Sequence, residues 1–349
     1  MTFGDRVRVI VGFPLETELV ERIRACPFID ELIFEPDLLP RPRYPNDHAG
    51  APLVLEAAAN ERWHALLRRA DVLFGYPGET SASLAQALEV GQGIRFVQGT
   101  SAGMGAHVQR ARLGAAILER VLFASAAGVH AGMLAEFVFY GMLTLRKDAQ
   151  RLARLRRDRC WEHYVMGELE GSEIAVVGMG QIGCAVSSRA RAFGMRVVAV
   201  TRMGEPHPLA DETHATSEIG SVMRRCDAVV LTLPLTDRTR YLVDAAAIGG
   251  MRPDAIFVNV GRGAIADSSA LLEALAKGRI AGAVLDVFDP EPLPSDHPFW
   301  DMQNVIMSPH TAALSVHENR RIVEIFCENV ERLVAGRPLR NAINLIEFY

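Results

Sequence analysis

Three glycines between an apolar segment and a helical segment constrain the fold of this chain more than any other feature of its sequence. Residues 173–177 (EIAVV) predict a buried strand, and GMGQIG follows it directly. In this spacing the first glycine permits a tight turn, the second lets the backbone approach a ligand, and the third lets the next helix pack on the strand. The N-terminus of that helix offers free N–H groups to phosphate. The segment therefore predicts a parallel α/β domain that binds a dinucleotide through Gly178, Gly180, Gln181, Ile182 and Gly183.

Strand-like and helix-like segments alternate along most of the chain. Short β-rich runs alternate with helical patterns before residue 125, and a second such series extends from residue 173 to residue 310. Strands are predicted near residues 6–13, 70–76, 94–98, 173–177, 196–200, 226–231, 255–260, 280–288 and 304–308. This alternation is typical of parallel sheets covered by helices, so the predicted fold class is α/β. Because 349 residues exceed one ordinary core, we expect two domains.

The charge and the cysteines argue against several kinds of partner. The formal net charge is −5, so we expect neither nucleic acid nor a membrane as a partner. The N-terminus carries Asp5, Arg6 and Arg8 and has no small-residue cleavage site, unlike a signal peptide, so we expect a cytoplasmic protein. The cysteines form no CxxC pair and no His/Cys cluster, which predicts buried reduced thiols and no metal site. They are Cys26, Cys160, Cys184, Cys226 and Cys327.

The most apolar stretch of the chain covers residues 121–145. It contains His130 and Glu136 and is rich in glycine and alanine, so it predicts a buried helix rather than a membrane span. From residue 133 to residue 159 the pattern predicts one long helix, apolar in its first half and basic in its second. We expect this helix to cross between the domains and its arginines to form a solvated face.

Thr201 and Arg202 stand where a fold of this type often has an acid. That acid binds the ribose 2′-hydroxyl of NAD about 20 residues beyond the glycine motif, yet positions 200–202 hold no carboxylate. A guanidinium can instead hold a 2′-phosphate through paired, charge-assisted hydrogen bonds. Arg202, together with the Thr201 hydroxyl, therefore favours NADP(H). NAD(H) remains the alternative cofactor if Arg202 is an ordinary exposed loop residue.

Three further strand ends carry residues suited to acid–base chemistry. Arg262 follows one predicted strand, Asp286, Asp289 and Glu291 follow another, and His310 follows a third. Open α/β sheets bind ligands at the carboxyl ends of their strands. Each residue alone fits an ordinary surface position, but together behind a dinucleotide motif they predict an active site.

Five motifs of this chain resemble those of the D-2-hydroxyacid dehydrogenase family, which includes glyoxylate/hydroxypyruvate reductases: VVGMGQIG, LPLTDRT, VNVGRG, LDVFDPEPLP and HPFWDMQNVIMSPHTAA. The resemblance is dense over residues 171–313 and loose before residue 99. It implies two Rossmann-like domains with parallel sheets, the cofactor domain being inserted into a flavodoxin-like substrate domain. The substrate domain would comprise residues 1–125 and 314–349, and the dinucleotide-binding domain residues 126–313. A homodimer is also implied.

The resemblance further implies a role for each site residue. Arg262 would clamp the substrate carboxylate, His310 would protonate the keto oxygen as hydride arrives, and Glu291 would orient His310. Contacts to the cofactor would come from Val260, Gly261 and Asp286 near the nicotinamide and from Leu233 and Pro234 near the adenosine. Substrate contacts would come from Ser101, Ala102, Gly103 and Met104. The implied reaction reduces a small 2-keto acid to the D-2-hydroxy acid with NAD(P)H, NADPH being favoured.

Some features depart from the family pattern and leave alternatives open. The motif SAGMGAH lacks the Gly-Val-Asp common after this glycine turn, so the choice of substrate stays open among glyoxylate, hydroxypyruvate, pyruvate and bulkier keto acids. A formate dehydrogenase is an alternative, although it would have glutamine where Glu291 stands. A nucleotide-sensing binding module, like the corepressors built on this fold, is another. Turnover of a keto acid separates that module from the enzyme.

Overall fold

The chain forms two compact units. The structure is a computed structural model that describes residues 4–346. The first unit comprises Met1–Val129 and Leu314–Tyr349, and the second comprises His130–Ala313. The junctions thus follow residues 129 and 313, where the sequence suggested 125 and 313. Each unit has one parallel sheet with helices on its faces, so the predicted α/β fold class is confirmed.

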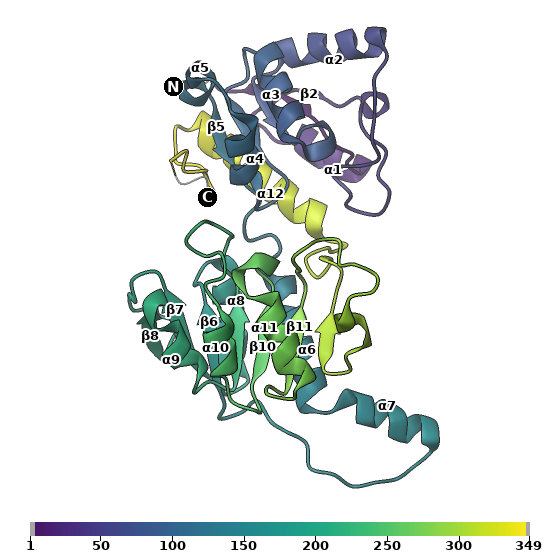
Figure 1. The fold of residues 1–349 in the computed structure, drawn as a ribbon. Helices are drawn as coiled ribbons and strands as arrows, with labels where there is room; N and C mark the ends of the chain where they lie inside the picture. The colour runs from purple at the N-terminus through teal and green to yellow at the C-terminus, as the bar shows by residue number, and fades with distance from the viewer. Residues whose placement is uncertain (1–3, 347–349) are drawn as a thin grey trace. The chain divides into compact units, whose positions relative to one another are not determined.

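The first unit is built on a five-stranded sheet in the order β2-β1-β3-β4-β5 (Figure 1). Its strands are β1 (Val7–Val11), β2 (Ile29–Ile33), β3 (Val72–Phe74), β4 (Phe96–Gln98) and β5 (Leu122–Ala124). Its helices are α1 (Thr17–Arg24), α2 (Ala57–Arg69), α3 (Ser81–Val90), α4 (Met104–Ala111), α5 (Ala115–Arg120) and α12 (Glu318–Val334), with short 3-10 turns η1 (Pro36–Leu38) and η2 (Pro77–Glu79).

Both faces of this first sheet are covered. Alternate side chains of β1 enter two separate cores: Val9 packs with residues of α1 and α12, and Ile10 packs with residues of α2, α3 and α4. The ring of Phe74 stacks on Phe326 of α12 with 4.0 Å between ring centroids. Burial on both faces explains why the central strand β3 (VLF) is a continuous apolar run, which is the pattern of a parallel sheet, whereas the edge strand β2 (IDELI) contains acidic residues.

The second unit is built on a seven-stranded parallel sheet in the order β12-β11-β10-β9-β6-β7-β8. Its strands are β6 (Glu173–Val177), β7 (Arg196–Thr201), β8 (Glu212–Ala215), β9 (Ala228–Leu231), β10 (Ile256–Asn259), β11 (Gly282–Leu285) and β12 (Val305–Met307). Its helices are α6 (Ala131–Arg146), α7 (Ala149–Asp158), α8 (Gln181–Ala192), α9 (Ile219–Met223), α10 (Ala245–Gly249) and α11 (Ser268–Ala276), with 3-10 turns η3 (Thr216–Glu218), η4 (Gly263–Ile265) and η5 (Pro298–Asp301).

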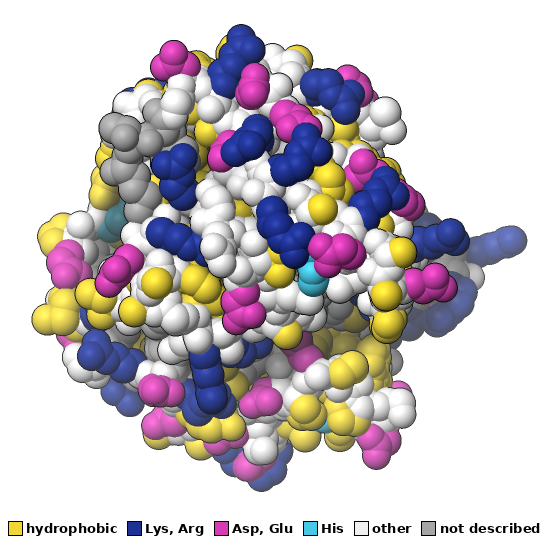
Figure 2. Space-filling model, turned by 90° about the horizontal axis from the view of Figure 1, so that it is seen from above, with side chains coloured by type: hydrophobic (Ala, Val, Ile, Leu, Met, Phe, Trp, Pro, Cys, Tyr) yellow, Lys and Arg dark blue, Asp and Glu magenta, His cyan; other side chains and the backbone are white. Residues whose placement is uncertain are grey.

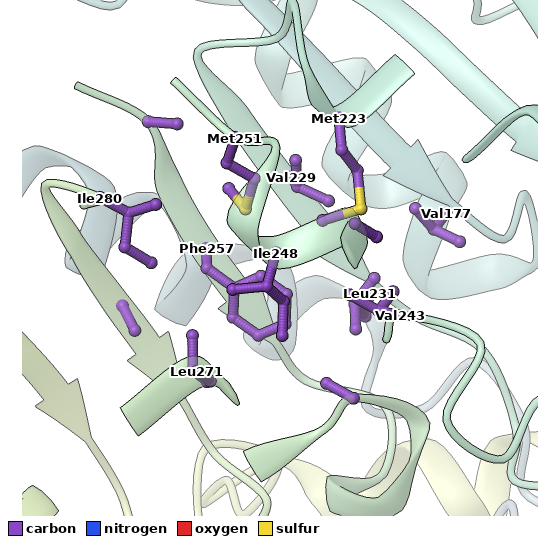
Figure 3. Close-up of a cluster of buried hydrophobic side chains, with 14 of the residues drawn as sticks. Val177, Met223, Val229, Leu231, Val243, Ile248, Met251, Phe257, Leu271 and Ile280 are labelled. Carbon is purple, nitrogen blue, oxygen red and sulfur yellow. The ribbon is translucent and has the colours of Figure 1, made fainter. Parts of the chain in front are cut away.

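This second sheet is also buried on both faces. One face packs against α6 and α8, and the other packs against α9, α10 and α11. Figure 3 shows part of the latter core, in which Met223, Ile248 and Leu271 gather over Val229 and Phe257 of the sheet. The two faces hold the strands rigid, so their carboxyl ends are fixed in position.

Two helix predictions are wrong. The apolar stretch 121–145 begins with strand β5, because Phe123 and Ala124 complete the first sheet, and only its later part is helix α6. The single helix expected over residues 133–159 is two helices, α6 and α7. Both belong to the second unit, so the expected crossing between the domains is wrong as well. Asp148 separates them with a left-handed backbone (φ 48°), and its side chain caps α7 by accepting a hydrogen bond from the Arg151 amide. Aspartate tolerates this conformation and is a preferred N-cap.

The surface mixes charges of both signs. On the face shown in Figure 2, Lys and Arg side chains are interspersed with Asp and Glu rather than gathered in one patch. Within residues 4–346, the helices are too short or too polar to cross a membrane. In the same residues, His, Cys, Asp and Glu form no group of three or more that could hold a metal ion.

Candidate active site

In the second unit, the predicted site residues lie at or just beyond the carboxyl ends of parallel strands, Thr201 being the last residue of β7. They lie at the ends of β6 (Gly178, Gly180, Gln181, Ile182, Gly183), β7 (Thr201, Arg202), β9 (Leu233, Pro234), β10 (Val260, Gly261, Arg262), β11 (Asp286, Glu291) and β12 (His310). Since all these strands are parallel, their ends meet at one edge of the sheet. The fold therefore gathers residues that are far apart in the sequence at a single edge.

The glycine turn after β6 has a different requirement at each glycine. Gly178 has a positive φ of 100°, and a Cβ at Gly183 would lie 1.9 Å from the Gly178 carbonyl oxygen. The Thr232 hydroxyl donates to the Val177 and Gly178 carbonyl oxygens over 3.1 and 2.7 Å and holds the turn. Gly180 differs, because no protein atom lies within 4 Å of the position of an added Cβ. Packing explains the first and third glycines, and the open space beside Gly180 suits the close approach of a pyrophosphate.

The loop after β7 contains an acid that the sequence analysis did not consider. The Thr201 hydroxyl donates to Glu205 Oε2 over 3.2 Å and accepts from the Gly204 amide over 3.0 Å. Arg202 and Glu205 are both exposed. The Thr201 hydroxyl therefore contacts the carboxylate of Glu205, and Thr201 is followed in the sequence by Arg202. In the sequence this acid stands four positions beyond Thr201, after Gly204, and so outside the position where the acid is usually expected.

The loops after β9 and β10 contact each other through backbone atoms. A Cβ at Gly261 would lie 2.7 Å from the Leu233 carbonyl oxygen, so only glycine permits this approach. Asn259 shapes the second loop: its Oδ1 accepts from the Gly261 amide over 3.1 Å, and its Nδ2 donates to the Arg262 carbonyl over 3.0 Å. The sequence analysis missed Asn259, although an asparagine inside an otherwise apolar strand was a usable signal.

Arg262 is exposed at this edge of the second unit. Its Nη1 donates to the Gly261 carbonyl oxygen over 2.6 Å. The guanidinium carries five donors in a planar fork, which suits bidentate binding of a carboxylate.

His310 and Glu291 form the pair that the sequence predicted. His310 Nδ1 lies 2.8 Å from Glu291 Oε2, and Glu291 Oε1 accepts from the Phe288 amide over 2.8 Å. Both side chains are partly exposed, at 44% and 35%. Because Nδ1 faces the carboxylate, the other ring nitrogen, Nε2, is the one available to a ligand. The carboxylate is fixed by the Phe288 amide and in turn fixes the imidazole ring.

Asp286 holds the segment that carries His310. It is 1% exposed, and its carboxylate accepts hydrogen bonds from the Ser308 hydroxyl and the Ala312 amide, the latter over 3.0 Å. Its carbonyl oxygen accepts from the His310 amide, also over 3.0 Å. His310 itself has a left-handed backbone with φ 53°, so the segment is tightly turned. The contacts found here support a positioning role for Asp286, and Ser308 joins it as a residue that the sequence analysis missed.

The predicted substrate loop lies in the first unit, at the carboxyl end of β4. Ser101, Ala102 and Gly103 are at least partly exposed, and α4 begins directly after them. Met104 is fully buried in the core of the first unit, with its sulfur 3.4 Å from the Tyr76 hydroxyl. Met104 therefore supports the loop from within this unit.

A cavity of about 320 Å³ opens in the first unit, at the carboxyl end of β1. It is lined by Pro14, Leu15, Glu16, Pro42, Arg43, Tyr44, Pro45, Asn46, Asp47 and Asn319. Arg43 donates to both oxygens of the buried Asp47 over 2.6 and 2.9 Å, and this hydrogen bonding holds the pKa of Asp47 well below its usual range. The sequence analysis did not predict this cavity, whose lining includes the proline-containing segment 42–47.

Comparison with known proteins identifies the family. The model of the D-isomer specific 2-hydroxyacid dehydrogenase NAD-binding domain matches residues 139–312. An uncharacterized protein in the proB 3′ region of Corynebacterium melassecola is 33% identical over 316 residues, covering 88% of this chain and 98% of that protein. The crystal structure of a D-isomer specific 2-hydroxyacid dehydrogenase family protein from Aeromonas salmonicida has a TM-score of 0.77 and 26% identity, covering 97% of this chain and 99% of that one.

The chain belongs to the D-isomer specific 2-hydroxyacid dehydrogenase family. This confirms the resemblance inferred from the motifs and, with it, the class of NAD(P)-dependent oxidoreductase. Glyoxylate/hydroxypyruvate reductase B of Enterobacter sp. is 37% identical over 180 residues, which cover 51% of this chain and 55% of that reductase. The chain thus matches about half the length of this reductase.

Proposed function

We propose that this 2-hydroxyacid dehydrogenase family member reduces a small 2-keto acid to the D-2-hydroxy acid and prefers NADPH. The observation that carries the proposal is the His310–Glu291 pair, 2.8 Å apart, at the same sheet edge as Arg262 and the glycine turn. An acid–base group, a carboxylate-binding cation and a dinucleotide turn together are what hydride transfer to a keto acid requires.

In the proposed reaction, Arg262 binds the substrate carboxylate and His310 Nε2 gives its proton to the keto oxygen. A bound reduced nicotinamide supplies the hydride. Glu291 accepts from His310 Nδ1–H, which keeps Nε2 directed away from the carboxylate and stabilises the imidazolium. In the reverse direction, neutral His310 takes the hydroxyl proton. The amides of Ser101, Ala102 and Gly103 in the first unit are proposed as further substrate contacts.

Arg202 is proposed to select NADPH by pairing with the ribose 2′-phosphate, assisted by the Thr201 hydroxyl. Glu205 acts against this preference, because its carboxylate accepts from the same hydroxyl and repels a dianion. The two exposed residues therefore set the ratio between NADPH and NADH. Gly178, Gly180 and Gly183, with the N-terminus of α8, hold the pyrophosphate, while Leu233 and Pro234 contact the adenosine and Val260 and Gly261 the nicotinamide ring.

Steady-state kinetics test this proposal directly. The kcat/KM of the purified protein is measured for glyoxylate, hydroxypyruvate, pyruvate and phenylpyruvate, each with NADPH and with NADH. We expect turnover with NADPH preferred, a preference lost in Arg202→Ala and increased in Glu205→Gln. Arg224→Ala, which removes an exposed arginine after α9, is the matched control and leaves the ratio unchanged. Equal use of NADH by the unmodified protein would refute the NADPH preference, and tight cofactor binding without any turnover would favour a binding module.

The proposal includes a homodimer in the cytoplasm. Large apolar side chains are exposed on α6, α7 and the segment that follows, which all belong to the second unit: Tyr140, Leu152, Trp161, Val165 and Met166. Trp161 is 91% and Val165 98% exposed. A second copy of this chain is the occupant we propose for these side chains, because large apolar side chains gathered in water mark contact sites.

A further inference from the structure

The structure brings together two cysteines that the sequence places at opposite ends of the chain. All five cysteines are free, and the prediction that they are buried is correct for Cys226 alone. Cys160 is exposed, whereas Cys26, Cys184 and Cys327 are partly buried. Cys26 and Cys327 differ by 301 positions (327 − 26), yet both lie where α1 packs against α12, and both pack on the same hydrophobic core.

The contact between these cysteines is part of a helix–helix interface in the first unit. Cys26 follows the end of α1, and its amide donates to the Ile23 carbonyl oxygen over 3.0 Å. Cys327 lies within α12, and α1 and α12 pack side by side (Figure 1). One helical turn away, Arg22 Nη2 and Glu324 Oε1 pair over 3.1 Å across the same interface. Both cysteines pack against the same hydrophobic core, which fixes their relative position.

The surroundings make the two thiols chemically unequal. Hydrogen bonds from the Cys327 thiol and the Phe28 amide lower the pKa of Cys26 to about 6, against the effects of burial and of Glu331. The same hydrogen bond and burial raise the pKa of Cys327. Of the two thiols, Cys26 is therefore the more acidic and the better source of a thiolate. Cys226 contrasts with this, because burial raises its pKa to about 12.

We propose that Cys26 and Cys327 are a reversible redox pair that forms a disulfide between α1 and α12 by exchange with a small disulfide of the glutathione class. The Cys26 thiolate attacks one sulfur of oxidised glutathione, breaks its S–S bond and releases one glutathione thiolate. Cys327 then loses its proton to solvent and attacks the Cys26 sulfur, which releases the second glutathione. The two cysteines are oxidised by two electrons, and oxidised glutathione is reduced to two thiols.

This disulfide would tie the first helix of the chain to the last. Cross-linking segments this far apart restricts the unfolded chain strongly, so the oxidised form gains stability. The disulfide would also protect the sulfur of Cys26 from further oxidation. Redox-sensing pairs of this kind combine a partly exposed thiolate with a neighbouring resolving cysteine.

Equilibration in graded mixtures of reduced and oxidised glutathione tests the proposal without measuring catalysis. A Cys160→Ser background removes the exposed thiol, and non-reducing peptide mapping with intact mass identifies the products. We expect a cross-linked peptide pair that contains Cys26 and Cys327, together with a melting temperature higher by roughly 5 °C or more. Both effects reverse with dithiothreitol.

Single variants distinguish the roles of the two sulfurs. In Cys327→Ser, glutathione stays attached to Cys26, because no resolving thiol is present. In Cys26→Ser, oxidation produces neither the mixed disulfide at Cys327 nor the stability gain. Absence of the cross-linked peptide at every ratio would refute the proposal, and so would stable glutathionylation of Cys26 while Cys327 is intact. A disulfide that joins two copies of the chain would also refute it.

Discussion

The glycine turn after β6 allows ligand binding and packing to be separated by two neighbouring substitutions of the same kind. Gly183→Ala would place a Cβ 1.9 Å from the Gly178 carbonyl oxygen. Carbon and oxygen in contact are normally about 3.3 Å apart, so the helix and the turn must separate by about 1 Å or more. We expect a loss of about 3 kcal/mol or more in the free energy of unfolding, at the upper end for overpacking.

Gly180→Ala should instead weaken cofactor binding and leave the free energy of unfolding nearly unchanged. Its φ is −73°, and no protein atom lies within 4 Å of the new Cβ, so the folded chain accepts the methyl group. Alanine is a poorer N-cap than glycine but restricts the unfolded chain, and the two effects offset each other to within about 1 kcal/mol. The methyl group should instead displace the pyrophosphate. Loss of one charge-assisted hydrogen bond, about 1.5–3 kcal/mol, corresponds to cofactor binding that is about 10- to 150-fold weaker.

Urea unfolding and fluorescence titration with NADPH and NADH measure the two quantities separately. Gly220→Ala in α9 is the matched control, since a Cβ there also meets no protein atom within 4 Å. Cofactor affinity unchanged in Gly180→Ala would refute the assignment of this glycine to pyrophosphate binding. Unchanged stability in Gly183→Ala would refute the packing argument.

Three further predictions concern other parts of the chain. Glu291→Gln should lower kcat by about 10- to 100-fold and leave the cofactor Kd unchanged, because the amide orients the imidazole without stabilising its charge; an unchanged kcat would contradict this role. Asp47→Asn should cost about 1–3 kcal/mol of stability at pH 7, since it removes a buried carboxylate that accepts from Arg43. Because the pKa of Asp47 is lowered, its carboxylate contributes to stability above about pH 4, and this contribution is lost as the pH falls further. The free energies of unfolding of the unmodified protein and of Asp47→Asn, measured with urea, should therefore converge in acid. Trp161→Glu should convert a dimer into a monomer in analytical ultracentrifugation, whereas Val54→Glu, a change at a comparably exposed apolar residue of the first unit, should not; equal sedimentation of both variants would contradict the proposed interface.

The sequence predicted best the features that depend on local pattern. Apolar strands followed by glycine or polar residues can be recognised in the sequence alone, and for this reason Gly178, Arg262, Glu291 and His310 could be named as candidate site residues. Parallel topology then brings their strand ends to one edge without further information. The polar strand β8 gave no such pattern, because ETHA is a half-exposed edge strand.

Residues that act through other residues were harder to predict. Asn259, Ser308 and Thr232 hold loops by hydrogen bonds to partners between 2 and 55 positions away, and no spacing rule identifies such pairs. Glu205 was missed because it bonds Thr201 across a turn rather than occupying the expected position. The contact of Cys26 with Cys327 depends on packing of α1 against α12, which the order of elements does not reveal.

The discontinuity of the first unit has a consequence for the order in which the protein forms on the ribosome. Residues 130–313 are synthesised as one continuous block with a complete seven-stranded sheet, so this unit can fold as soon as it emerges. The first unit cannot be completed then, because α12 supplies Ile322, Phe326 and Val330 to one face of a sheet whose strands were made about 200 to 310 residues earlier. The part of that face that α12 covers is therefore exposed in the nascent chain until residues 318–334 have been synthesised.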